Sequence, residues 1–143
     1  MTHSISLLRR SAAVLGVATV AASLSLVAPA VSGAATKTVA VKLSDFKVTP
    51  AVKSVKAGKV TFVVKNAADM THELVVIKTT KKAADLPMNG GSASEKGSVG
   101  ETGDVSGGKT KKLTLTLKKG HYALICNLPG HYQSGMFADF TVS

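Results

Sequence analysis

Apolar and polar residues alternate with a period of two in several short segments after residue 37, and turn residues separate these segments. This pattern is typical of β-strands with one buried face, and no convincing amphipathic helix interrupts it. The clearest runs cover residues 39–43, 60–64, 74–77, 113–117, 122–126 and 137–142. Six or more strands in about 109 residues predict one all-β domain, a sandwich of two sheets with Greek-key connections.

Two predictions concern the connections between these runs. Lys118-Lys119-Gly120 separates the fourth run from the fifth and predicts a hairpin that pairs them. Residues 81–109 lack the alternation and contain seven glycines, so we expect a long loop there. A helical turn near residues 81–86 is compatible with the sequence, but Pro87 would end it.

Residues 1–34 have the composition of an export signal peptide. Arg9 and Arg10 are the only arginines, and an uncharged, alanine-rich stretch follows them. Small residues suit cleavage after Ala34 or Ala35, with Ala28-Pro29-Ala30 as a second possible site, and we take residues 35–143 as the domain. We therefore expect an exported protein, periplasmic or extracellular, and the arginine pair is compatible with Sec or twin-arginine export. The alternative is an uncleaved membrane anchor, because the stretch is long enough to span a bilayer.

Cys126 is the only cysteine, so an internal disulfide is excluded. An exported protein rarely keeps an unpaired thiol without a use for it, although a buried, inert cysteine is the alternative. His131 and Met136 follow at intervals of five residues, and both carry soft or borderline donor atoms. Pro129-Gly130 and Gly135 allow the chain between them to fold back. One loop after a strand can therefore bring three metal donors together.

A fourth donor has to come from elsewhere in the chain. His3 lies in the leader, and His121 is five residues before Cys126 on the same strand, so its side chain projects from the opposite face. We expect His121 to be exposed and unrelated to the site. His72 lies at a junction between two strands, where a turn at one pole of a sandwich can hold a ligand. The set of one cysteine, two histidines and one methionine fits a type 1 copper site better than a structural zinc site.

The sequence resembles the cupredoxin, or blue copper, family, which includes plastocyanin, azurin and rusticyanin. The residues that carry the resemblance are Gly120-His121-Tyr122-Ala123-Leu124-Ile125-Cys126, Pro129-Gly130-His131, Gly135-Met136 and, upstream, Asn66 and His72. The Cys-x4-His-x4-Met spacing is more similar to the rusticyanin and auracyanin type than to plastocyanin. The resemblance implies one copper ion with His72, Cys126 and His131 as equatorial ligands and Met136 as the axial ligand.

One position departs from the family pattern. Many members have an asparagine after the first histidine, and its side chain helps to tie the two ligand loops together. This chain has Glu73 at that position.

The resemblance implies that the protein carries single electrons by Cu(I)/Cu(II) cycling. Four protein ligands leave no open position for a substrate, so we do not expect an enzyme. The alternative is copper storage or delivery, at which Met70 and Met88 hint, although neither is paired with a histidine at a useful spacing. A metal-free adhesion sandwich with a structural Cys126 is a third, weaker interpretation.

We expect a monomer that exchanges electrons with a redox protein through the edge of His131, beside Leu128 and Pro129, while His72 lies deeper. Residues 35–143 contain 16 lysines and 8 acidic residues, a formal charge of +8. The lysines are scattered without clustered aromatic residues, so we predict no nucleic-acid binding. The basic surface is either merely solvated or attracts an acidic redox partner or an anionic envelope surface.

Overall fold

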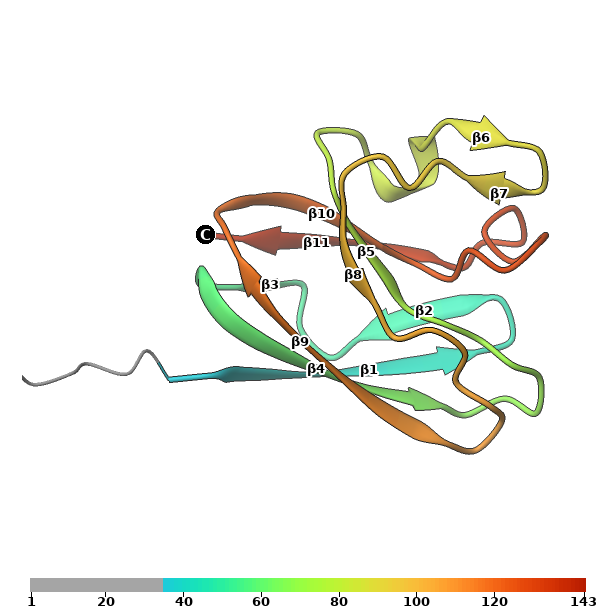
Figure 1. The fold of residues 1–143 in the computed structure, drawn as a ribbon, viewed down its shortest axis with the longest axis horizontal. Helices are drawn as coiled ribbons and strands as arrows, with labels where there is room; N and C mark the ends of the chain where they lie inside the picture. Colours follow the sequence, from blue (N-terminus) through green and yellow to red (C-terminus); the bar gives the residue numbers. More distant parts are fainter. Residues whose placement is uncertain (1–34) are drawn as a thin grey trace, which may run out of the picture. The chain divides into compact units, whose positions relative to one another are not determined.

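The computed structural model describes residues 35–143, so the predicted leader, residues 1–34, lies outside the described residues. The described part is built almost wholly from strands (Figure 1). The elements are β1 (Lys37–Ser44), β2 (Lys47–Pro50), β3 (Ser54–Val55), β4 (Gly58–Asn66), β5 (Val75–Lys78), the 3₁₀ turn η1 (Ala83–Asp85), β6 (Met88–Asn89), β7 (Ser92–Ala93), β8 (Ser98–Glu101), β9 (Thr110–Leu117), β10 (Gly120–Ile125) and β11 (Phe137–Val142). Within these residues, no helix has the length and apolar character needed to cross a membrane.

Nine of the strands form the two sheets of a sandwich. Sheet A has the order β2-β1-β4-β9, and sheet B has the order β3-β11-β10-β5-β8. β1 pairs in parallel with β4, and β11 pairs in parallel with β3, whereas the other pairs are antiparallel. In Figure 1 the strands of sheet A lie below those of sheet B, and the small β6–β7 sheet lies at the upper right. The predicted two-sheet sandwich is confirmed.

The core lies between the two sheets, and the alternation of the strands fills it. In sheet A the inward positions of β1 and β4 are apolar and buried, as Val41 and Phe62 illustrate, while their neighbours face solvent. In sheet B the central strand β10 is buried on both faces. Tyr122 and Leu124 join the main core, whereas Ala123 and Ile125 pack outward against η1 and its flanking segments. Tertiary packing therefore holds β10 on two sides.

The predicted hairpin between residues 113–117 and 122–126 is wrong. β9 pairs with β4 in sheet A, and β10 pairs with β5 and β11 in sheet B. The link at Lys118 and Lys119 therefore crosses from one sheet to the other, and the Tyr122 hydroxyl donates a hydrogen bond to the Lys118 carbonyl at 2.7 Å. β10 lies in the middle of sheet B because both of its faces are apolar, whereas the outer face of β9 is polar.

The predicted long loop at residues 81–109 is only partly correct. The expected helical turn is present as η1, and Leu86 and Pro87 follow it. The rest is not a plain loop, because it contains the β6–β7 sheet and β8, which pairs with β5 as an edge strand of sheet B. β8 has no apolar alternation because none of its four residues is fully buried.

Candidate metal centre

The segment from Cys126 to Met136, which we call the ligand loop, closes on itself through its own backbone. The Cys126 amide donates to the Met136 carbonyl at 3.0 Å, and the Met136 amide donates to the His131 carbonyl at 3.2 Å. Gly130 and Gly135 have φ angles of 80° and 105°, in the region where residues with a Cβ are strained. The predicted folding back of this loop is therefore confirmed, and it holds Cys126, His131 and Met136 in one turn of chain.

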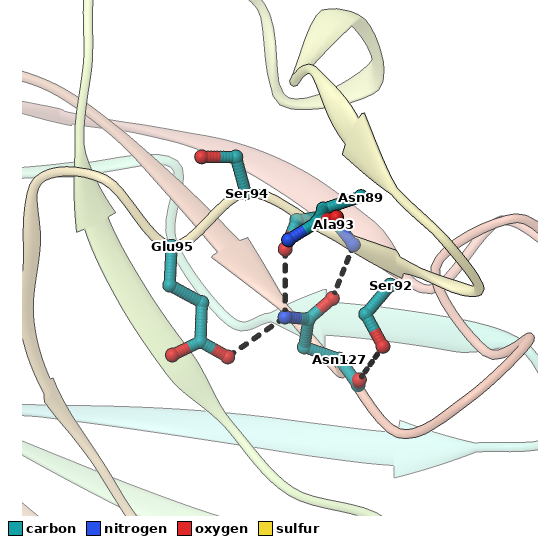
Figure 2. Close-up of a pocket in the computed structure, with 6 residues that line it drawn as sticks. All are labelled: Asn89, Ser92, Ala93, Ser94, Glu95 and Asn127. Atoms are coloured by element: carbon teal, nitrogen blue, oxygen red, sulfur yellow. Dashed lines mark hydrogen bonds between the residues drawn. The ribbon is translucent and has the colours of Figure 1, made fainter.

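Asn127 anchors the ligand loop to the β6–β7 sheet (Figure 2). Its side-chain amide donates to the Ala93 carbonyl at 3.0 Å and to Glu95 Oε1 at 2.7 Å, and its Oδ1 accepts from the Ala93 amide at 2.7 Å. The Gly130 amide adds a bond to the Gly91 carbonyl at 3.0 Å. The hollow in Figure 2 therefore lies where two segments meet, and the polar side chain of Asn127 in it is already hydrogen-bonded to its neighbours. Sequence reasoning missed this role because Ala93 and Glu95 lie more than 30 residues upstream of Asn127.

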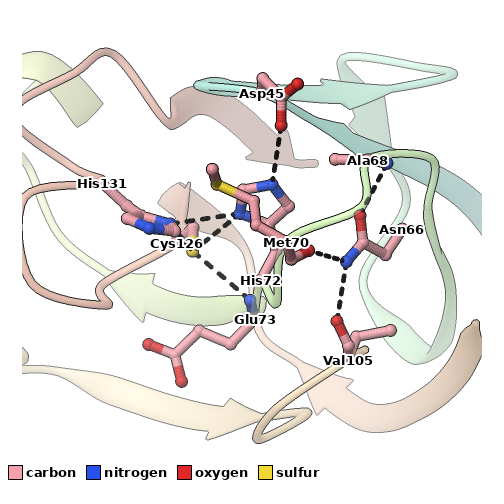
Figure 3. A network of polar contacts seen from close by, with 9 residues as sticks. All are labelled: Asp45, Asn66, Ala68, Met70, His72, Glu73, Val105, Cys126 and His131. Atoms are coloured by element: carbon pink, nitrogen blue, oxygen red, sulfur yellow. Dashed lines mark hydrogen bonds and ion pairs between the residues drawn. The ribbon is translucent and has the colours of Figure 1, made fainter. Parts of the chain in front are cut away.

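His72 is presented by a second segment, residues 66–73, which we call the His72 segment (Figure 3). The fully buried Asn66 holds it in place: its side chain donates to the carbonyls of Met70 and Val105, both at 2.8 Å, and accepts from the Ala68 amide at 3.0 Å. His72 itself forms a β-bridge with Val105 and exchanges both backbone hydrogen bonds with it. Asn66 thus shapes the segment from within, and the bonds to Val105 fix it from outside.

The two segments bring three donor atoms together. The Nδ1 atoms of His72 and His131 are 3.2 Å apart, and Cys126 Sγ lies 3.8 Å from the first and 3.4 Å from the second. His72, Cys126 and His131 offer the ligand atoms of the only potential metal cluster found within residues 35–143. Three of the four predicted site residues are therefore gathered at one point.

Met136 and His121 are the other residues that the sequence analysis considered. Met136 is fully buried and belongs to the same core cluster as Cys126, which agrees with a donor approaching from the interior. His121 lies apart from the three donors. It is not exposed as predicted, because its side chain is 29% accessible and its Nε2 lies 2.8 Å from Asp139 Oδ1. Its Nδ1 faces the Thr79 carbonyl at 3.1 Å, so it ties the strand β10 to the segment after β5.

Burial sets the protonation of the donors. It lowers the pKa of His72, and the neighbouring His131 lowers it further, against the opposing effect of Asp45. The imidazole is therefore neutral near pH 7 and has a free lone pair for a metal. Burial raises the pKa of the Cys126 thiol, against the opposing effect of the backbone amides of Glu73 and Leu128. A metal ion that binds the thiolate must accordingly displace a proton.

Glu73 ties the two segments together. Its carboxylate Oε1 accepts a hydrogen bond from the Asn127 amide at 3.1 Å, and its own amide donates to Cys126 Sγ at 3.4 Å. The residue after the first histidine thus connects the two loops, although it is a glutamate where many cupredoxins have an asparagine. Burial raises the pKa of this carboxyl, and the nearby Glu101, Glu95 and Asp104 raise it further, against the Asn127 hydrogen bond.

The donor set fits copper. Two imidazole nitrogens and a thiolate are the equatorial donors of type 1 copper sites, and a buried thioether is a suitable weak fourth donor. His72 Nε2 has no hydrogen-bond partner, and Asp45 Oδ1 lies 3.8 Å away from it. With Nδ1 bound to a metal, Nε2 would carry the proton and face this carboxylate, which is a common outer contact of metal-bound histidine.

Comparisons with known proteins agree with this geometry. A model of the family described as copper binding proteins, plastocyanin/azurin family, matches residues 35–143, the whole described part. No curated protein matches the chain.

Solved structures of similar fold include two auracyanins and a rusticyanin. The reduced auracyanin of Roseiflexus castenholzii has a TM-score of 0.59 and 21% identity over 75% of this chain and 97% of its own. Auracyanin A of Chloroflexus aurantiacus, a blue copper protein, has a TM-score of 0.57 and 22% identity over 76% of this chain and 100% of its own. Rusticyanin of Thiobacillus ferrooxidans has a TM-score of 0.58 and 19% identity over 76% of this chain and 77% of its own.

At these identities the solved structures establish the fold, and the family model establishes the lineage. The resemblance seen in the sequence is confirmed, and copper is the cofactor that the site is built for. The chain belongs to the plastocyanin/azurin family of copper-binding proteins.

Proposed function

We propose that this protein is a one-electron carrier with one type 1 copper ion per chain. Cys126 Sγ and the Nδ1 atoms of His72 and His131 are the equatorial ligands, and Met136 is the axial ligand. The observation that carries the proposal is the convergence of the three equatorial donors within 4.8 Å of one another. The bound copper would supply the Cu(I)/Cu(II) couple.

The surroundings of the donors suit electron transfer. His72, Cys126 and Met136 are fully buried, and two separately anchored segments meet at them. A site that keeps one geometry in both oxidation states has little to rearrange when an electron moves. Because four protein donors fill the coordination sphere, no position is left for a substrate, and we propose no catalytic activity.

Electrons enter, in this proposal, through His131, the half-buried ligand of the set. The ring of Phe46 meets the His131 ring edge-on, at 5.8 Å between centroids, and is itself 43% exposed. Phe46 has a φ of 54°, a left-handed conformation that costs a non-glycine residue roughly 1–2 kcal/mol. Leu128 is half-buried and its carbonyl accepts a hydrogen bond from the His131 amide at 2.9 Å. His131 thus has an apolar side chain on each of two neighbours, Phe46 and Leu128, which suits the small interfaces of transient redox encounters.

Voltammetry of the copper-loaded protein tests the proposal. A reversible one-electron wave and fast exchange with a small redox mediator are expected. Leu128→Asp should slow exchange with a protein partner while the visible spectrum stays unchanged, and Val52→Asp, at an exposed apolar residue of the β2–β3 connection, is the matched control. An unaltered rate in Leu128→Asp at normal copper content would place the entry point elsewhere.

Copper delivery is the second candidate, because the exposed Met70 lies two residues before His72 and offers a thioether outside the buried site. Rapid loss of Cu(I) to a chelator, abolished by Met70→Ala, would favour delivery over electron transfer. Retention of Cu(I) under the same conditions would favour the carrier.

We also propose that residues 1–34 direct export to the periplasm or the cell exterior, where the domain works as a monomer. The support is the composition of this leader and the single thiol of the domain. Terminal sequencing of protein recovered outside the cytoplasm should start near residue 35. An intact N-terminus on the recovered protein would contradict cleavage.

A further inference from the structure

The lysines that look scattered in the sequence are gathered by the fold. The outward positions of sheet A hold five of them, which we call the lysine face: Lys42, Lys47, Lys59, Lys65 and Lys112. All five side chains are exposed. The four strands of sheet A contain no acidic residue, so all eight carboxylates of the domain lie elsewhere.

The register of the strands brings like charges together. Lys42 on β1 lies directly opposite Lys65 on β4, and these are the two central strands of the sheet. Like charges in directly opposite positions destabilise a sheet. Both ion pairs in the described part of the chain involve a histidine, so no lysine between residues 35 and 143 has a carboxylate within 4.0 Å. The lysine face therefore carries an uncompensated positive charge, although the domain has eight acidic residues that could have paired with it.

The chemistry of this face distinguishes between partners. Apart from the lysines it consists mainly of threonines, with the small Ala40 and the half-buried Val63. The exposed large apolar residues of the domain, Phe46, Val52, Met70, Met88 and Val99, all lie outside the strands of sheet A. Protein interfaces have apolar or aromatic anchors at their centre and are poor in lysine. A broad, anchor-free lysine surface is instead suited to a layer of negative charge, such as anionic lipid headgroups.

We propose that the lysine face binds the surface of an anionic lipid bilayer. The metal centre lies beyond the ends of the strands, since the ligand loop follows β10 and the His72 segment follows β4. A domain that lies flat on sheet A therefore keeps the His131 end at the side, free to meet a partner on the same membrane. This binding does not involve copper, so the proposal goes beyond electron transfer. A failure of the electron-transfer proposal would leave it unaffected.

Vesicle binding tests the proposal. Residues 35–143 hold both sheets and the whole described core, and the family model spans them, so they are used as a self-contained domain, with and without copper. The probes are vesicles of phosphatidylcholine alone and with about one third phosphatidylglycerol. We expect binding only to the anionic vesicles, equal for both copper states, and loss of binding when the Debye length falls from about 10 Å to about 3 Å in 1 M salt.

A matched pair of triple variants locates the binding surface. Lys42→Gln, Lys59→Gln and Lys112→Gln together should weaken vesicle affinity by about a hundredfold, since each lysine near such a surface contributes about fivefold. Lys81→Gln, Lys82→Gln and Lys96→Gln together remove the same charge from the segment after β5 and should leave most of the affinity. Thermal unfolding of both variants checks that the sandwich is intact.

Three results would overturn the proposal. Equal losses in the two triple variants would mean that net charge alone drives adsorption. Binding to poly-L-glutamate through the lysine face without binding to the anionic vesicles would identify an acidic polypeptide as the partner. Binding to neither probe would leave the lysine face as a merely solvated surface.

Discussion

The two segments that meet at the metal centre are built by opposite means. The ligand loop supplies Cys126, His131 and Met136 from eleven consecutive residues, and its own backbone hydrogen bonds close it. The His72 segment supplies a single donor, and it depends on Asn66 and on a β-bridge to Val105, more than 30 residues away. The first is a local structure that spacing in the sequence reveals, whereas tertiary contacts place the second.

The difference also separates their roles. His72 is fully buried and faces the interior, whereas His131 is half-buried and contacts the exposed ring of Phe46. In the proposed carrier, the inward ligand His72 would keep the geometry of the site, and the outer ligand His131 would face the redox partner. Variants that damage one segment and spare the other should therefore have different consequences.

The largest effect is expected from Cys126→Ser, which breaks the ligand loop at its central donor. A hydroxyl cannot replace the thiolate, so the copper affinity should fall by more than the roughly 10–100-fold typical of outer-contact variants. The domain should stay folded, because serine keeps the Cys126 amide bond to the Met136 carbonyl. Copper titration and far-UV circular dichroism measure the two properties. A persistent charge-transfer band in this variant would refute the assignment of Cys126.

Asn66→Ala tests the His72 segment in turn. It removes three hydrogen bonds and leaves the Met70 carbonyl and the Ala68 amide without this partner, while the Val105 carbonyl keeps the His72 amide, which should cost about 2–4 kcal/mol of unfolding free energy. Copper affinity should fall about 10–100-fold because His72 is no longer held in place. Urea unfolding and copper titration measure this, and Asn89→Ala at the exposed end of β6 is the control. An unchanged unfolding free energy and an unchanged copper affinity in Asn66→Ala would show that Asn66 does not hold the His72 segment in place.

Met136→Leu removes the weakest donor of the ligand loop and should have a smaller effect. Copper binding at one ion per chain should persist, and the reduction potential should rise, because loss of an axial donor favours Cu(I). Voltammetry measures the shift, and Met88→Leu, at an exposed methionine, should leave the potential unchanged. Loss of copper from Met136→Leu would instead make this methionine a principal ligand.

The smallest effect concerns Glu73, the link between the segments. Glu73→Ala removes its bond to the Asn127 amide and should cost about 1–2 kcal/mol, whereas Glu73→Gln keeps an acceptor and should cost less. Because burial raises the pKa of Glu73, the carboxylate is protonated at a higher pH than usual. A raised pKa means that folding favours the protonated carboxyl, so stability is lost as Glu73 ionises. Glu73→Gln, which stays neutral, should therefore become more stable relative to the wild type as the pH rises through that pKa, and the gain should disappear at lower pH. Denaturant unfolding at several pH values measures this, and a pH-independent difference would exclude the charge of Glu73 as its cause.

The sequence predicted the sandwich and three of the four donors because these depend on local patterns, whereas His72 was predicted from its place at a junction between two strands and from the family resemblance. Alternation in residues 39–43 and 60–64 follows from one buried face, and the spacing of Cys126, His131 and Met136 follows from a single loop. It failed where pairing depends on distant residues. The link at Lys118 has the composition of a hairpin turn, but β10 pairs with β5 on one side and β11 on the other, which leaves no place for β9 beside it. β8 is a strand only because it pairs with β5.

The hydrogen bonds around the site could not be predicted from the sequence, because they too join distant residues. Glu73 was recognisable as a departure from the family asparagine, but its bond to Asn127 depends on how the two segments meet. Asn127 binds Ala93 and Glu95, which lie in a stretch without any periodic signal. Likewise, the central lysines of the lysine face, Lys42 and Lys65, are brought together by the parallel register of β1 and β4. The sequence of either strand alone does not reveal this register.

The most direct test of the account is the visible and EPR spectrum of the protein after addition of one equivalent of Cu(II). If the ligand loop and the His72 segment share one type 1 copper ion, the protein turns intensely coloured through thiolate-to-copper charge transfer and shows narrow hyperfine splitting. A colourless protein that binds copper with wide hyperfine splitting would contradict it, because the two segments would then not hold the ion between Cys126 and the two histidines.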